Sequence, residues 1–143
     1  MITNERQYSI TKAWAEKFSR ALVESTNQGP STLHPRALKA MRDGAESQLQ
    51  DLRDEIAEYE TLRSGDVTSL EANSILELTT ALVKARIVRN WTQKELATQM
   101  GLREQQIQRY EATQYKGVAV ERLQEVADAL RLRVREVITI EKL

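Results

Sequence analysis

The chain of 143 residues contains no cysteine. This absence excludes disulfide bonds, thiolate metal sites and cysteine nucleophiles. No run of apolar residues approaches the roughly 18 that a membrane span needs. The first ten residues, MITNERQYSI, lack the apolar core of a secretory signal. These absences favour a cytoplasmic protein that does not enter a membrane.

Residues that could carry catalysis are also scarce. The only histidine, His34, stands beside Pro35 in a predicted turn, where we expect a surface side chain rather than a base or a metal ligand. The sequence has no glycine loop that could cradle a phosphate, no nucleophile elbow and no HExxH pattern. Carboxylates gather over residues 51–60, but Arg53 interrupts them on an amphipathic helix, which favours a solvated face. We therefore expect no enzyme, no catalytic residue, no metal and no cofactor.

Charge is distributed unevenly although the formal net charge is zero. Residues 79–143 carry 12 Lys and Arg against 8 Asp and Glu, whereas residues 1–78 carry 9 against 13. Binding to phosphate requires positive charge near the contact rather than a basic average. The distribution favours nucleic-acid binding by the C-terminal half only.

The N-terminal half shows two helical patterns. We predict one helix from Thr11 to about Ser25, a turn at 27–31, and a long helix from Pro35 to about Arg63. The first helix has one apolar face, made by Trp14, Phe18, Ala21 and Leu22. The second has an apolar stripe about 40 Å long, made by Leu38, Met41, Ala45, Leu49, Leu52, Ile56, Tyr59 and Leu62. The stripe exceeds what the shorter helix can cover, so we expect a second subunit on the remainder.

Two short helices separated by a glycine are predicted over residues 91–112, WTQKELATQMGLREQQIQRYEA. Thr92 and Glu95 have the spacing of a capping box at the start of the first helix. Gly101 ends that helix because glycine enters the left-handed conformation at little steric cost. A further helix precedes the pair, from about residue 69 or 73 to Arg89, with its inward face at Ile75, Leu78, Leu82, Ala85 and Val88.

The second short helix carries side chains that can contact base edges. Its inward face holds Ile107 and Tyr110, and its outer face holds Arg103, Glu104, Gln105, Gln106, Gln108 and Arg109. A single exposed glutamine is usually only in contact with solvent. The many hydrogen-bond donors and acceptors on this one face favour contact with DNA. Thr92, Gln93 and Lys116 are further candidate contacts. We expect Gln93 and Lys116 to hold phosphates.

Several positions in this region are similar to the phage-repressor class of helix-turn-helix domains, also called Cro/cI or XRE. The matching residues are Thr92-Gln93, Leu96-Ala97, Gly101, Ile107 and Glu111, followed by Leu123, Ala127 and Leu130. The resemblance covers residues 79–134 and implies a lambda-repressor-like fold that binds double-stranded DNA. Leu102-Arg103 depart from the class, which often has Ser or Thr before the recognition helix. The start of that helix, and whether Arg103 faces a base or a phosphate, stay open.

Residues 132–140 alternate between apolar and polar side chains, which predicts a short strand that needs a partner, such as the same strand of a second subunit. We therefore predict an all-α fold with this one strand. An N-terminal helical region (1–68), used for dimerisation or partner binding, would precede the DNA-binding domain (69–143). The function expected is that of a dimeric transcriptional repressor. The alternative is an antitoxin that binds a toxin through its N-terminal half, because the layout resembles HigA-type antitoxins.

Overall fold

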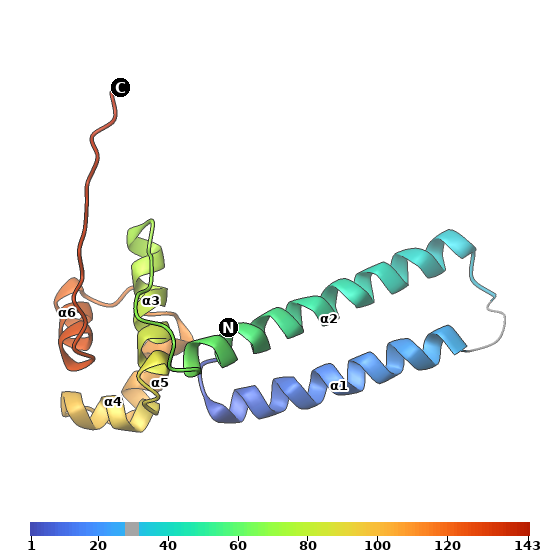
Figure 1. Ribbon diagram of the computed structural model, residues 1–143, viewed down its shortest axis with the longest axis horizontal. Helices are drawn as coiled ribbons and strands as arrows, with labels where there is room; N and C mark the ends of the chain where they lie inside the picture. Colours follow the sequence, from blue (N-terminus) through green and yellow to red (C-terminus); the bar gives the residue numbers. More distant parts are fainter. Residues whose placement is uncertain (28–31) are drawn as a thin grey trace. The chain divides into compact units, whose positions relative to one another are not determined.

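A computed structural model describes residues 1–27 and 32–143 of the chain, and its described residues contain helices but no strand (Figure 1). The helices are α1 (Glu5–Asn27), α2 (Pro35–Arg63), α3 (Ile75–Val88), α4 (Gln93–Met100), α5 (Glu104–Ala112) and α6 (Val120–Ala129). The predicted all-α fold class is confirmed. Apart from Asn27, the turn predicted at 27–31 lies outside the described residues. The chain divides into two compact units, Met1–Asp66 and Val67–Leu143.

The first unit is an antiparallel hairpin of α1 and α2, which lie side by side in Figure 1. Its buried apolar side chains are Ile2, Ala15, Leu49, Tyr59 and Leu62. At the end nearest the N-terminus, the rings of Tyr8 and Tyr59 have centroids 5.1 Å apart. The Arg63 guanidinium forms an ion pair with the Glu5 carboxylate beside them. The two helices are therefore joined by aromatic packing and by charge at this end.

Helix α1 begins six residues earlier than the sequence predicts, at Glu5 instead of Thr11. The side chain of Asn4 accepts a hydrogen bond from the Gln7 N–H at 2.9 Å, and so caps the helix. Because α1 has 23 residues, it runs along most of α2. The expectation that the helix before α2 is short is wrong, and α1 covers much of the stripe, although Met41 within it stays 64% exposed.

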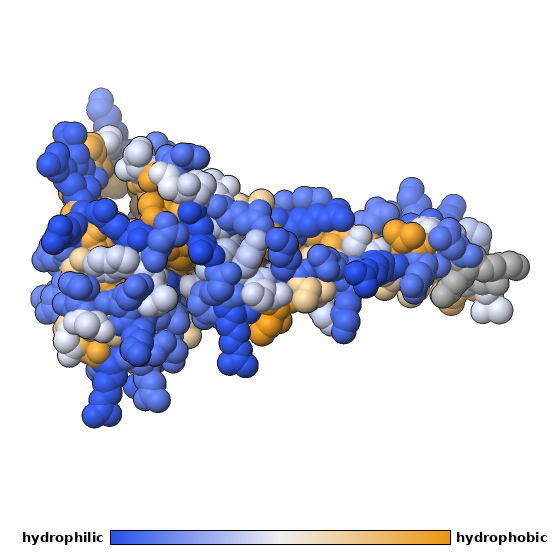
Figure 2. Space-filling model, turned by 60° about the horizontal axis from the view of Figure 1, so that its bottom comes forward, coloured by the Kyte–Doolittle hydropathy of each residue, from blue (hydrophilic) through white to orange (hydrophobic). Residues whose placement is uncertain are grey.

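Some apolar side chains of the hairpin remain exposed. Trp14 is 58% exposed, Ile10 60%, Val23 58% and Met41 64%. Figure 2 shows hydrophobic patches separated by hydrophilic side chains along the hairpin. The predicted apolar face of α1 therefore only partly faces α2, and Trp14 lies outside the contact.

The second unit packs α3, α4, α5 and α6 around one core. Helix α4 contacts α5 and α6, and α6 also contacts α3. The fully buried core side chains are Val83, Leu96, Ile107, Tyr115, Val126 and Leu130. On α3, Leu82 and Ala85 are buried as predicted, but Ile75 is 81% exposed. Helix α3 starts at Ile75, capped by the Ser74 hydroxyl, so that this side chain lies in the first turn, beyond the core.

The last residues of the second unit form no strand. After α6, Arg131 adopts a left-handed conformation with φ 54°, and residues 132–143 continue as an extended trace away from the helices (Figure 1). The strand predicted over 132–140 is not formed in the single chain. A strand requires a neighbouring backbone for its hydrogen bonds, and no backbone among residues 1–27 and 32–143 bonds to positions 133–143.

Candidate nucleic-acid interface

Helix α4 starts at a complete capping box. The Thr92 hydroxyl accepts a hydrogen bond from the Glu95 N–H at 3.1 Å, and the Glu95 carboxylate accepts one from the Thr92 N–H at 2.6 Å. The helix ends at Gly101, whose φ of 65° is left-handed. The Leu102 N–H then donates to the Ala97 carbonyl at 2.9 Å. These local interactions confirm the predicted helix boundaries and fix the turn between α4 and α5.

The start of α5, which the sequence leaves open, is clear in the structure. Arg103 has an extended backbone and directly precedes the helix. The Gln106 side-chain carbonyl accepts a hydrogen bond from the Arg103 N–H at 3.1 Å. The helix is thus capped from within its own first turn rather than by a Ser or Thr before it. This bond holds the Gln106 side chain against the start of the helix.

The outer face of α5 is exposed to solvent over its whole length. Its exposed residues are Arg103, Glu104, Gln105, Gln106, Gln108 and Arg109. The Gln108 amide donates to the Glu104 carboxylate at 3.4 Å. Within the described chain, no side-chain hydrogen bond involves Gln105 or Arg109. The exposed Arg103 guanidinium likewise donates no hydrogen bond within the described chain, so these three side chains are the ones most available to contact a ligand.

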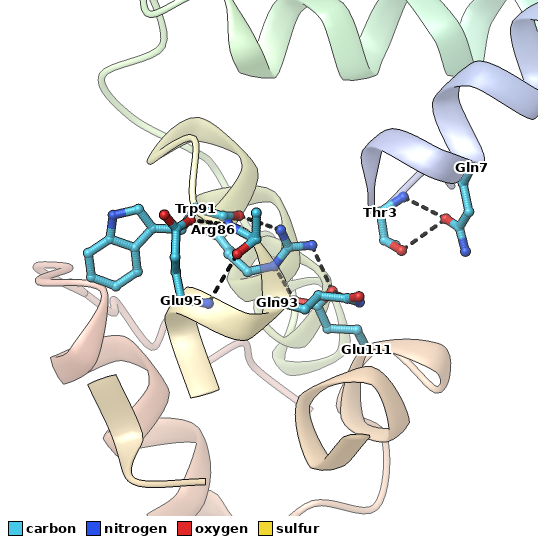
Figure 3. Close-up of polar contacts among 8 residues, drawn as sticks. Thr3, Gln7, Arg86, Trp91, Gln93, Glu95 and Glu111 are labelled. Atoms are coloured by element: carbon cyan, nitrogen blue, oxygen red, sulfur yellow. Dashed lines mark hydrogen bonds and ion pairs between the residues drawn. The ribbon is translucent and has the colours of Figure 1, made fainter. Parts of the chain in front are cut away.

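A buried polar cluster holds the opposite face of α5 (Figure 3). The Arg86 guanidinium of α3 donates to both carboxylate oxygens of Glu111 on α5, at 2.6 and 2.8 Å. It also donates to the Trp91 carbonyl at 2.6 Å. Arg86 and Glu111 are each 2% exposed, so this ion pair is almost wholly removed from water. The pair fixes α5 to α3 with two parallel hydrogen bonds.

Gln93 belongs to this cluster rather than to the outer surface. Its side-chain amide donates to the Glu111 carboxylate at 2.8 Å, and the residue is only 7% exposed. The sequence predicts a phosphate contact for this side chain, but the structure turns it inward. Its position gives it the role of holding Glu111 and joining α4 to the pair. Arg86 was not predicted from the sequence to be part of this site. The one indication was its position, because it lies four residues after Leu82 and so falls on the predicted inward face of the helix.

Lys116 is presented by a loop with an unusual backbone. Gln114, Tyr115 and Gly117 all have positive φ, at 54°, 58° and 75°. The Tyr115 side chain is 1% exposed and anchors the loop in the core, with its ring 5.8 Å from that of Tyr110. Burial raises the pKa of the Tyr115 hydroxyl, and the Glu111 charge acts in the same direction. Because Tyr115 points inward, its neighbour Lys116 is exposed.

Comparison with known protein families matches residues 82–137 to the family model described as Helix-turn-helix. Residues 82–137 are a helix-turn-helix domain of the Cro/cI class. The predicted resemblance is thereby confirmed, and with it a role in DNA binding and transcription regulation. Neither the curated proteins nor the solved structures gave a match to the chain.

The described residues show neither a membrane-spanning helix nor a cluster of metal ligands. None of their helices combines the length and the apolar character that crossing a membrane requires. Within residues 1–27 and 32–143, no group of three or more His, Cys, Asp and Glu side chains is placed to hold a metal ion. The exposed face of α5 is the candidate site, and Thr92, at the start of α4, and Lys116, in the loop after α5, are exposed as well.

Proposed function

We propose that the protein is a sequence-specific repressor that binds double-stranded DNA as a homodimer and performs no catalysis. The observation that carries the proposal is the contrast between the two faces of α5. One face exposes Gln105 and Arg109 without side-chain partners in the described chain, and the other is fixed by the buried Arg86–Glu111 pair. A rigid helix with an open polar face suits the major groove, where each base pair presents a distinct set of donors and acceptors.

Within this arrangement each exposed side chain has a different task. Gln105 lies in the first turn of α5, and its amide can both donate to and accept from adenine. Arg103 or Arg109 suits guanine, whereas Glu104 is shared between Gln108 and a cytosine amine. Lys116 in the following loop holds a phosphate and positions the domain without reading sequence.

A dimer follows from the small area that one short helix can cover. Helix α5 has 9 residues, about 14 Å of helix, and can contact only a few base pairs. Two copies related by a two-fold axis would place two such helices on half-sites about one duplex turn apart. The bound operator would then be a palindrome.

Selection of bound sequences from a random DNA pool tests the function. We expect enrichment of a palindrome whose half-sites are 10–11 base pairs apart, and binding that weakens steeply with salt. Lys116→Ala should weaken binding to all sequences alike and reduce the slope of log K against log salt by about one unit for each phosphate that is no longer bound. The matched control is Lys39→Ala on α2, which should change neither quantity. A pool without enrichment would overturn sequence-specific binding.

A second candidate function, that of an antitoxin, is supported by the exposed apolar side chains of the hairpin. Ile10 and Trp14 lie one helical turn apart on α1, in the half of the chain where acidic residues outnumber basic ones. Such a face would bind a toxin while the second unit binds the operator DNA of the operon. A neighbouring reading frame that arrests growth would be the first observation to seek. Neutralisation by the wild type but not by Trp14→Asp would support the antitoxin, and equal neutralisation by both would contradict this binding face.

A further inference from the structure

The segment after α6 exposes apolar side chains to an unusual degree. Val137, Ile138 and Ile140 are 91%, 88% and 92% exposed. Within the described chain, no hydrogen bond involves any residue from Arg133 to Leu143. Arg131 and Leu132, by contrast, are tied to α6 through their backbone N–H groups. The free segment thus begins at a fixed point on the surface of the second unit.

The composition of this segment is that of a β-strand. Five of the nine residues from 132 to 140 are β-branched, namely Val134, Val137, Ile138, Thr139 and Ile140. The segment contains no glycine and no proline. β-Branched residues favour strands because their side chains pack well on a pleated surface. A strand former with unpaired backbone groups needs a partner strand.

The charges of the segment are complementary to a second copy of itself. Arg133 and Glu141 are eight residues apart, with Val137 midway between them. If two copies run antiparallel with Val137 facing Val137, each Arg133 faces the Glu141 of the other copy. Val134 then faces Ile140 on the opposite side of the ribbon. Opposite charges and β-branched pairs directly across a ladder both stabilise it.

The alternative registers are less favourable. Centring the pair on Glu136 places two carboxylates opposite each other at the axis, which is destabilising. That register would pair Glu141 with Arg131, whose φ of 54° does not belong to a strand. Centring on Ile138 would place Val134 opposite Lys142 and Ile140 opposite Glu136. The register centred on Val137 places Glu136 opposite Ile138 and Leu132 opposite Lys142, but it combines the Arg133–Glu141 charge pair with the apolar Val134–Ile140 pair, and neither alternative has both pairs.

We propose that residues 132–142 of two copies pair as antiparallel strands, with Val137 at the two-fold axis and Arg133 opposite Glu141. The proposal rests on the homodimer of the proposed function and does not require DNA binding. It locates the dimer contact on the DNA-binding unit itself rather than on the hairpin. The partner is therefore a second copy of this chain.

The absence of cysteine permits a direct test by disulfide trapping in the full-length protein. Residues facing each other across antiparallel strands have Cα atoms about 4.5–5.5 Å apart, within disulfide range, whereas residues displaced by two positions are about 8 Å apart. Val137→Cys should therefore form a covalent dimer at least about ten times faster than Glu136→Cys or Ile138→Cys under mild oxidation. The control is Lys17→Cys, an exposed position on α1, which reports random collision.

A charge exchange tests the same register without oxidation. Arg133→Glu should raise the dimer Kd by about tenfold, since the two-fold axis repeats the disrupted pair. The exchange variant with Arg133→Glu and Glu141→Arg should restore the wild-type value. Arg135→Glu is the matched control, because Arg135 faces Thr139 in this register and should change Kd by less than about threefold.

The possible failures are distinguishable by sedimentation. A wild-type monomer at tens of micromolar would overturn the homodimer and the strand pairing together, whether or not DNA is bound. A wild-type dimer in which Val137→Cys cross-links no faster than Lys17→Cys would overturn the strand pairing alone. Fastest trapping at Glu136→Cys or Ile138→Cys would overturn the proposed register.

Discussion

Substitution of Glu111 by alanine should destabilise the second unit more than most single changes to it. The carboxylate is 2% exposed and accepts three hydrogen bonds at 2.6–2.8 Å, two from Arg86 and one from Gln93. Alanine at this position would remove the carboxylate that the buried Arg86 guanidinium pairs with. It would also leave the Gln93 amide without its acceptor. The Arg86 guanidinium is also held by the Trp91 carbonyl, and both side chains are buried, so neither easily reaches water.

The expected loss follows from these two effects. Removal of one partner from a buried ion pair costs about 3–5 kcal/mol of unfolding free energy. The orphaned Gln93 amide adds about 1 kcal/mol. A domain of roughly this size has about 4–12 kcal/mol of stability in total. Glu111→Ala should therefore remove at least a third of the stability of the second unit.

Urea unfolding monitored by the fluorescence of Trp91 measures this loss. Trp91 lies in the second unit, so a Trp14→Phe background removes the signal of the hairpin. The control replaces both charges, as Arg86→Met with Glu111→Leu, because an apolar pair leaves no buried charge. We expect this double variant to be more stable than Glu111→Ala alone. A loss below about 1 kcal/mol for Glu111→Ala would refute the reasoning.

Two further changes test the loop and the turn beside α5. The Tyr115 hydroxyl is buried and has no hydrogen-bond partner in the described chain, so Tyr115→Phe should leave stability at pH 7 unchanged or raise it by up to about 1 kcal/mol, as measured by urea unfolding. Because the pKa of Tyr115 is raised in the folded state, the Tyr115 hydroxyl loses its proton at lower pH in the unfolded state than in the folded state. The stability of the wild type should therefore fall as the pH rises above about 10, and the stability of Tyr115→Phe should fall less. Gly101→Ala should cost about 1–2 kcal/mol in the same assay, because φ is 65° although a Cβ would meet no atom within 4 Å. A Gly101→Ala protein as stable as wild type would show that the turn relaxes to another conformation.

The features predicted correctly from sequence are those fixed by neighbours along the chain. Thr92, Glu95 and Gly101 define the limits of α4 through hydrogen bonds within a few residues. The helical spacing of apolar residues, Leu96 and Ala97 in α4 and Ile107 in α5, distinguishes the inward face of each helix from its polar outward face. For this reason the fold class and the exposed face of α5 were predictable.

Features that depend on contacts between distant residues were not predictable in the same way. Gln93 looks like a surface residue at a helix start, and only the position of Glu111, 18 residues later, turns it inward. The early start of α1 depends on the cap at Asn4. The residues that follow Asn4 do not show the helical spacing of apolar side chains that would have predicted a helix there. The strand predicted at 132–140 is not formed in the structure, because a strand depends on a partner backbone that the local sequence pattern does not supply.

The central claim is that the outer face of α5 recognises DNA sequence, and a base-preference profile tests it most directly. Relative affinities would be measured for every single-base change in the selected operator, with the wild type, Gln105→Ala and the control Gln50→Ala, an exposed glutamine on α2. We expect Gln105→Ala to cost about 1–3 kcal/mol per half-site and to lose preference at one base position, with the others retained. Gln50→Ala should reproduce the wild-type profile. An unchanged profile for Gln105→Ala, or a uniform weakening across all positions, would contradict the proposed docking.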